Sequence, residues 1–211
     1  MGTFSKGILG GFSGTVGTVI GGSWKGIQYM RSQPNKRSGS STLKQLMQQA
    51  KFASVIAFES TMTGLLETSF RDYAVKMSGY NNAVSYNLKN AVSGTYPDFA
   101  IDYSLALVSR GSLSNATAPA ATTTAGEVFF TWTDNSGVGN ASADDAAILV
   151  VYCAAVKTTI YTLNGGTRSA GAGSIEVPGF AGNTVQTWLG FIAADGKKIA
   201  NSFFTGALTV S

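Results

Sequence analysis

Apolar residues in the first half of the chain recur with the spacing of α-helices. After the hydroxyl-rich stretch that ends at Thr42, apolar side chains follow every three or four positions to about Ser60, which predicts one helix over this range. Residues 64–77 and 81–94 repeat the pattern more briefly and predict two further helices. We therefore expect a helical region over residues 41–95.

From Pro97 onward, apolar and polar residues instead alternate in short runs with the composition of β-strands. Turn-forming residues separate these runs, so we expect an antiparallel β-sandwich over residues 96–211, in an order close to that of a fibronectin type III or immunoglobulin-like module. An Asp-Gly pair within Ala194–Lys198 predicts a hairpin turn. The seven predicted strands are FAIDYSLALVS, EVFFTWT, AILVVYCA, TTIYTL, SIEV, TVQTWLGFIA and SFFTGALTV.

Three features refine this β-rich part. Trp132 and Trp188 lie in the middle of predicted strands, so we expect both side chains to anchor the core between the two sheets. Residues 114–126 form a low-complexity stretch that we expect to be an exposed loop. Cys153, the only cysteine, lies in an apolar run and is expected to be a buried core residue.

The first 40 residues follow neither pattern. Ser5–Gly26 holds eight glycines, no acidic residue and scattered large apolar side chains, which is too much glycine for a stable helix and too much apolar surface for an ordinary linker. Residues 31–41 are rich in turn formers and indicate a linker. We expect an α+β fold with a Gly-rich basic arm over residues 1–40, a short helical segment, and a C-terminal antiparallel β-sandwich.

Charge is scarce and unevenly distributed. Charged residues make up 12% of the chain and the net charge is +4, yet residues 1–58 hold seven Lys or Arg and no acid, whereas the remainder has a net charge of −3. A basic end can meet the acidic body of a neighbouring copy, nucleic acid or anionic lipid. The candidate contacts to such acidic or anionic partners are Lys6, Lys25, Arg31, Lys36, Arg37 and Lys44.

Residues that commonly carry chemistry are sparse. The sequence contains no histidine, which removes the commonest general base and the commonest metal ligand. The glycines of the arm match neither of the phosphate-binding glycine motifs. Residues 134–145 carry three carboxylates, but their spacing favours a turn with Asx hydrogen bonds over a calcium site. We therefore expect no enzyme, no cofactor, no metal site and no small-molecule substrate.

Residues 7–24 form an uncharged stretch that raises the question of a membrane segment. The stretch has eighteen residues, just long enough to span a bilayer, but seven of them are glycine and few are Leu or Ile. We expect no integral membrane span. Because the chain begins at Met1, we expect no cleaved signal peptide. An extracellular filament or a virion is the location that we favour.

Three blocks of the sequence are familiar together: KGILGGFSGTVGTVIGGSWKG, WTDNSGVGNASADDAAILVVY and RSAGAGSIEVPGFAGNTVQTWLGFIAADGKKIANSFFTG. Through these blocks the chain resembles a family of uncharacterised proteins of similar length from Bacteroidota and some of their phages. That family has a glycine-rich N-terminal block and a fibronectin-type-III-like C-terminal part. The resemblance covers essentially the whole chain. It implies the domain order and a bacterial or phage source, and it transfers no active site.

These observations favour a self-assembling structural protein, such as a filament, tube or virion component. The arm cannot bury its apolar side chains by itself, so docking on other copies would remove them from water, and strand addition would pair its amides. The alternatives are an adhesion or binding module anchored through its arm, and a nucleic-acid-associated protein that uses the basic N-terminal region. It also stays open whether the arm folds back on its own domain. The expected assembly interface consists of Phe4, Ile8, Leu9, Phe12, Val16, Val19, Ile20, Trp24 and Ile27.

Overall fold

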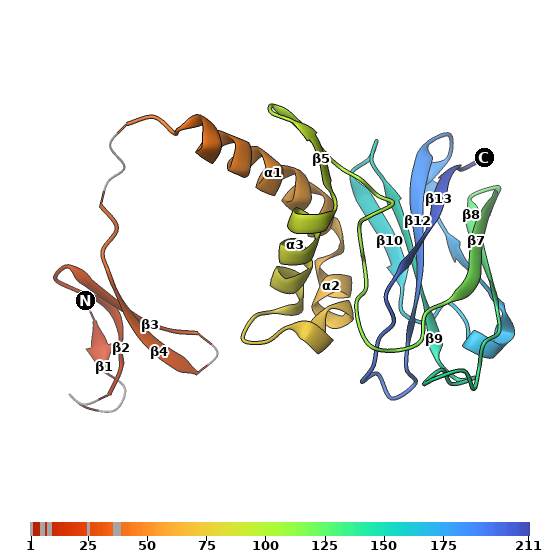
Figure 1. The fold of residues 1–211 in the computed structure, drawn as a ribbon, viewed down its shortest axis with the longest axis horizontal. Coiled ribbons are helices and arrows are strands. Elements are labelled where there is room, and N and C mark those ends of the chain that lie inside the picture. Colours follow the sequence, from red (N-terminus) through yellow and green to blue (C-terminus); the bar gives the residue numbers. More distant parts are fainter. Residues whose placement is uncertain (1, 5–6, 8–9, 25, 36–38) are drawn as a thin grey trace. The chain divides into compact units, whose positions relative to one another are not determined.

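The computed structural model describes residues 1–211 except residues 1, 5–6, 8–9, 25 and 36–38. The chain divides into two compact units, residues 1–42 and residues 43–211, here called the N-terminal unit and the C-terminal unit. The N-terminal unit is a small sheet, whereas the C-terminal unit combines helices with a β-sandwich (Figure 1).

The glycine-rich arm folds into a four-stranded antiparallel sheet in the order β1-β2-β3-β4. Gly17 and Gly26 lie in its two tight turns with φ of +59° and +80°, a left-handed conformation that glycine adopts without strain. Part of the glycine content that excluded a helix therefore serves hairpin turns. The strands are β1 (Thr3–Phe4), β2 (Phe12–Val16), β3 (Val19–Trp24) and β4 (Ile27–Ser32).

The helices predicted over residues 41–95 are present, and the second and third are shorter than predicted. The second helix stops at Ser69 because Phe70 leaves the helical conformation (φ −117°, ψ 12°). The third begins at Gly79, where the side chain of Ser78 caps it by accepting a hydrogen bond from the backbone nitrogen of Asn81 at 3.2 Å. The helices are α1 (Leu43–Glu59), α2 (Thr63–Ser69) and α3 (Gly79–Asn90), with 3-10 turns at Ser60–Met62 and Arg71–Tyr73.

The sandwich has seven strands in two antiparallel sheets. Its first, second and fifth strands form the sheet β11-β8-β7, and the others form the sheet β10-β9-β12-β13. The chain therefore has an α+β fold with a β-sandwich, as predicted. The strands are β7 (Thr117–Thr124), β8 (Glu127–Thr133), β9 (Ala146–Cys153), β10 (Thr158–Thr162), β11 (Ala172–Glu176), β12 (Thr184–Ile192) and β13 (Phe203–Thr209).

Both faces of the four-stranded sandwich sheet are covered. The helices lie over one face and the three-stranded sheet lies over the other (Figure 1). The core between the two sheets includes Phe130 and Phe191, and the core between the helices and the sheet includes Phe58 and Val150. Because it is covered twice, β9 is apolar at consecutive positions, and seven of its eight residues are buried.

One predicted sandwich strand is wrong. The alternation after Pro97 gives only the short strand β6 (Asp98–Ile101), which pairs with β5 (Val92–Thr95) in a separate hairpin. The chain then runs on without strand structure, and Ala106 and Val108 are buried in the core under the helices. The alternating residue Leu105 is 55% exposed, so the apolar alternation there does not mark one buried face of a sheet.

The seventh strand comes instead from the stretch expected to be a loop. Residues 114–126 contain β7, which pairs with β8 at one edge of its sheet. Burial alternates along its Thr- and Ala-rich sequence, as in a strand with one covered face. Pro119 is compatible with this position because an edge strand does not need every amide for pairing.

The other local predictions for the sandwich have mixed outcomes. Trp132 is buried in the core between the sheets, as predicted. Trp188 is wrongly predicted, because it points to the opposite face of its sheet and packs under the helices, where its indole nitrogen donates to the carbonyl oxygen of Ala106 at 3.1 Å. Cys153 is fully buried, and the Asp-Gly turn is present, with Gly196 at φ +66°.

Within the described residues, none of the helices has both the length and the apolar content needed to cross a membrane.

Candidate assembly interface

The register of the N-terminal sheet distributes its apolar side chains over two faces. Residues directly opposite each other on neighbouring strands point to the same face, and Val16–Val19 and Trp24–Ile27 are such pairs. One face, here called the Phe12 face, carries Phe12, Val16, Val19 and Met30. The other, here called the Trp24 face, carries Ile20, Trp24, Ile27 and Tyr29.

Glycines inside the strands let aromatic rings lie on the sheet. A Cβ atom at Gly21 would collide with the carbonyl oxygen and the ring of Phe12. A Cβ atom at Gly22 would lie 3.0 Å from the ring of Tyr29, the residue opposite it on β4. These glycines therefore allow close approach within the sheet itself, where aromatic rings lie over them.

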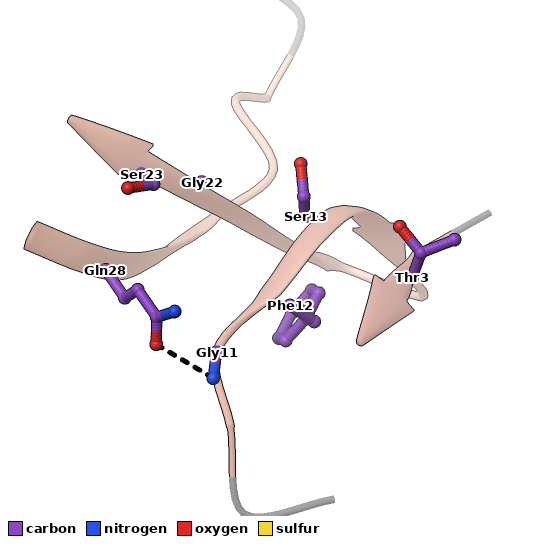
Figure 2. Close-up of a pocket in the computed structure, with 7 residues that line it drawn as sticks. All are labelled: Thr3, Gly11, Phe12, Ser13, Gly22, Ser23 and Gln28. Carbon is purple, nitrogen blue, oxygen red and sulfur yellow. Dashed lines mark hydrogen bonds between the residues drawn. The ribbon is translucent and has the colours of Figure 1, made fainter. Parts of the chain in front are cut away.

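A hollow of about 140 Å³ lies in this sheet (Figure 2). Gln28 reaches across it, and its Oε1 accepts a hydrogen bond from the backbone nitrogen of Gly11 at 2.8 Å. The residues around the hollow are Thr3, Gly11, Phe12, Ser13, Gly22, Ser23 and Gln28. Since this set supplies hydroxyls and one amide but no acid or base, the hollow offers no catalytic arrangement among the described residues.

Large apolar side chains remain in contact with solvent on both faces of the sheet. Trp24 and Ile27 are each 53% exposed, and Met30 is 71% exposed. Val16, Val19 and Tyr29 are also exposed, while Phe12 and Ile20 are half-buried. Among the described residues of the N-terminal unit only Gly21 is buried, so this sheet has no core of its own.

One edge of the sheet is long and open. β4 pairs with β3 on one side, and no strand among the described residues pairs with its other side. All six residues of β4 are exposed, and the strand contains no proline and a single charged residue, Arg31. Natural edge strands are usually protected by proline, several charges or a bulge. The β4 edge lacks these protections and is able to accept another strand.

The structure places the remaining predicted contacts as follows. Phe4 lies in β1, whereas Ile8, Leu9, Lys6, Lys25, Lys36 and Arg37 lie outside the described residues. Arg31 is exposed on the Trp24 face, opposite Ile20. Lys44 is exposed in α1 and so belongs to the C-terminal unit. Six of the nine predicted apolar residues thus lie in this sheet with side chains that the structure describes, three on each face: Phe12, Val16, Val19, Ile20, Trp24 and Ile27.

Sequence reasoning did not single out Met30 among the exposed apolar residues of this sheet, and it placed the start of the linker too early. Residues 27–32 alternate Ile, Tyr and Arg with Gln, Met and Ser, and this alternation is a strand signal. Because β4 extends through Arg31 and Ser32, the linker starts after Ser32. Met30 and Tyr29 therefore belong to the same exposed strand, one on each face.

In the C-terminal unit the unusual polar groups have structural roles. Arg168 is fully buried and its Nε donates to Asp145 Oδ2 at 3.0 Å. Its other nitrogens donate to Asn135 Oδ1 at 2.7 Å and to the carbonyl oxygen of Ser114 at 2.9 Å, and its guanidinium lies 3.8 Å from the ring centroid of Phe191. This pair joins three connecting segments at one end of the sandwich, and the sequence offered no signal for it.

Glu59 is the second unusual group. Its side chain is fully buried at the end of α1, and its Oε1 accepts a hydrogen bond from Asn87 Nδ2 at 2.7 Å, while Oε2 has no hydrogen-bond partner among the residues that the structure describes. Burial raises the pKa of Glu59 from 4.5 to about 8, although the hydrogen bond from Asn87 works in the opposite direction. Asn87 also bonds both backbone groups of Leu107, so the carboxyl belongs to a link between the helices and the segment that follows them.

Comparison with known proteins gives one match. A family model described as a family of unknown function (DUF6266) matches residues 11–206, which include β2 to β4, the helices and nearly all of the sandwich. No curated protein and no solved structure matches the chain.

Proposed function

Since the chain belongs to this family of unknown function, we propose from its own geometry that it is a self-assembling structural protein, a component of a filament, tube or virion. In this proposal the N-terminal unit joins copies of the chain and the C-terminal unit forms the body of the particle.

The observation that carries the proposal is the solvent exposure of large apolar side chains on both faces of a sheet that has no core. Burying one such side chain is worth about 1.5–3 kcal/mol. Trp24, Ile27 and Met30 are each more than half exposed, so covering them contributes free energy that offsets part of the entropy cost of joining copies. An enclosed C-terminal unit offers a stable body that does not depend on this contact.

Charge supports the same division of roles. Residues 1–42 hold five Lys or Arg and no acid, while residues 43–211 hold ten Lys or Arg and eleven acids. The N-terminal unit is therefore basic and the C-terminal unit is close to neutral with a slight acidic excess. Packing the sheet against the body of a neighbouring copy meets no strong charge repulsion.

Sedimentation velocity of the full-length chain over a wide concentration range tests the proposal. We expect the wild type to form species larger than the monomer, and we expect the double variant Trp24→Ser, Ile27→Ser to shift the distribution toward the monomer. The matched control is Val138→Ser, Val156→Ser, which changes two residues of the C-terminal unit that are 63% and 50% exposed. A wild type that stays monomeric throughout, or a control that dissociates as much as the double variant, would contradict the proposal.

A second candidate function is contact with single-stranded nucleic acid. The Trp24 face carries two exposed aromatic rings, Trp24 and Tyr29, together with Arg31, a combination that stacks bases and attracts phosphates. Fluorescence anisotropy with labelled oligothymidine tests it. This function predicts binding that weakens steeply with salt and is lost in Tyr29→Ser, Arg31→Ser. An anisotropy that stays at its starting value at low salt would reject it.

A further inference from the structure

We infer that two copies of the chain join through their β4 edges, which pair antiparallel around a two-fold axis at Met30. The inference rests on the proposed function, because it specifies how the N-terminal unit makes its first contact. Each copy contributes the four-stranded sheet β1-β2-β3-β4, and the pairing makes one continuous sheet with two-fold symmetry. The occupant of the open edge is therefore a second copy of this same edge.

The two edges of the N-terminal sheet are not equivalent. β1 is a two-residue strand, Thr3–Phe4, and offers little backbone to a partner. β4 has six residues, shows no shift in its register with β3, and is exposed along its whole length. A strand edge of this kind presents a row of backbone N–H and C=O groups for pairing with another chain. The β4 edge is thus the one suited to strand addition.

Side-chain faces restrict the register of this pairing. Antiparallel strands place residues of one face opposite residues of the same face, so a two-fold axis through β4 passes through a residue that faces its own copy. An axis at Arg31 would put two guanidinium groups directly opposite each other, which is unfavourable. An axis at Tyr29 would put Arg31 opposite the apolar Ile27. An axis at Met30 avoids both arrangements.

The register about Met30 is chemically complementary. It puts Met30 opposite Met30 of the second copy on the Phe12 face, an apolar contact for the most exposed large apolar side chain among the described residues of the sheet. It also puts Arg31 opposite Tyr29 on the Trp24 face, where a guanidinium can lie over the ring. The C-terminal unit already uses such contacts, since Arg110 lies 4.6 Å from the ring centroid of Tyr73 and 4.8 Å from that of Tyr86.

Edge pairing leaves the two faces of the joined sheet open. A two-fold contact is closed and gives a dimer only, so Trp24, Ile27 and Val16 remain available on the dimer for contacts with further copies. Because each N-terminal unit carries several cations and no acid, pairing brings like charges together. Salt screens that repulsion, so dimer formation increases with salt, whereas contact with nucleic acid decreases with salt.

Single cysteines in the full-length chain test the inference. Cys153 is fully buried, so it does not compete with a new surface thiol. Residues directly opposite each other in an antiparallel pair have Cα atoms about 4.5–5.5 Å apart, within the range that a disulfide requires. Under mild oxidation we expect Met30→Cys to shift to twice the monomer mass on a non-reducing gel. The matched control, Thr15→Cys, places an exposed thiol on the interior strand β2 and should remain at the monomer mass.

A mixing experiment tests the register. An axis at Met30 puts Gln28 opposite Ser32, so we expect little cross-linking of Gln28→Cys alone or of Ser32→Cys alone, and a disulfide-linked dimer when the two variants are mixed. Equal cross-linking of Met30→Cys and Thr15→Cys would overturn the inference, as would cross-linking of Gln28→Cys alone to at least the extent seen in the mixture.

The outcomes also separate this inference from the proposed function. If the wild type assembles in sedimentation but Met30→Cys does not cross-link, edge pairing is wrong and self-assembly stands. If the wild type remains monomeric and Met30→Cys does not cross-link, both are wrong. If Met30→Cys cross-links only after oligothymidine is added, nucleic acid brings the copies together and direct edge pairing is overturned.

Discussion

The chain contains two four-stranded antiparallel sheets that differ in what covers them. The sheet β10-β9-β12-β13 is packed between helices and a second sheet, and its Trp188 is fully buried. The sheet β1-β2-β3-β4 has no second layer among the described residues of its unit, and its Trp24 is 53% exposed. The same residue type therefore stabilises the fold in one sheet and stays exposed to solvent in the other.

The largest effect that we expect comes from truncating the buried tryptophan. Trp188→Ala should lower the free energy of unfolding by about 3–5 kcal/mol, because it leaves a cavity between the helices and the sheet and removes an indole hydrogen bond. Trp24→Ala, the matched change in the exposed sheet, should alter it by less than about 0.5 kcal/mol. Denaturant unfolding followed by circular dichroism measures both. An equal loss of unfolding free energy in the two variants would mean that the two tryptophans do not differ in their contribution to the fold.

A somewhat smaller loss is expected from the buried ion pair. Arg168→Met should cost about 3 kcal/mol, because Asp145 would stay buried without its cation while the methionine keeps part of the packing on Phe191. The double variant Arg168→Met, Asp145→Asn should recover part of this loss in the same unfolding assay. If the single variant is as stable as the wild type, the pair does not hold the connecting segments together.

Glu59 predicts a pH-dependent effect of smaller size. The pKa of Glu59 is about 8 in the folded state, against an ordinary value of 4.5, so between these two values the folded state binds one proton more than the unfolded state. The contribution of Glu59 to the free energy of unfolding is therefore greatest below pH 4.5 and is lost as the pH rises to about 8. Glu59→Gln keeps a neutral group there and should be more stable than the wild type at pH 8.5, by on the order of 2 kcal/mol. The two proteins should be similarly stable near pH 4.5.

Unfolding midpoints measured across this pH range check the prediction, with Glu67→Gln as a control at an exposed carboxylate that bonds the backbone nitrogen of Tyr80. The exposed sheet has no comparable group, because residues 1–42 contain no acid. A difference between wild type and Glu59→Gln that is the same at every pH would mean that Glu59 is not neutral in the fold.

The local pattern of apolar and polar residues predicted most of the helices and strands, and it failed where packing against distant residues determines the secondary structure. The period of residues 42–60 predicted α1, and short β-type runs predicted β8 to β13: most of these runs alternate, whereas β9, which is covered on both faces, is a continuous apolar run. The segment after Pro97 alternates like a strand, but its alternating residue Leu105 is 55% exposed, while its neighbours Ala106 and Val108 enter a core made by distant residues. The Thr-rich β7 has too little apolar content to stand out from a loop.

The candidate interface was predictable in composition but not in geometry. The mixture of glycine and large apolar residues in the first 27 positions indicated side chains without a core, and the structure gives six of them a place in one sheet. Which side chains share a face depends on the register of two hairpins, which in turn depends on turns at Gly17 and Gly26. The importance of β4 and Met30 follows only from the strand order, which leaves that edge open.

Amide hydrogen exchange at increasing protein concentration tests the central claim most directly. If the N-terminal sheet joins copies of the chain, the amides of residues 27–32 should exchange more slowly as the concentration rises, while those of β9, already buried within one chain, should not change. Exchange in residues 27–32 that stays equally fast from the lowest to the highest concentration would contradict the account.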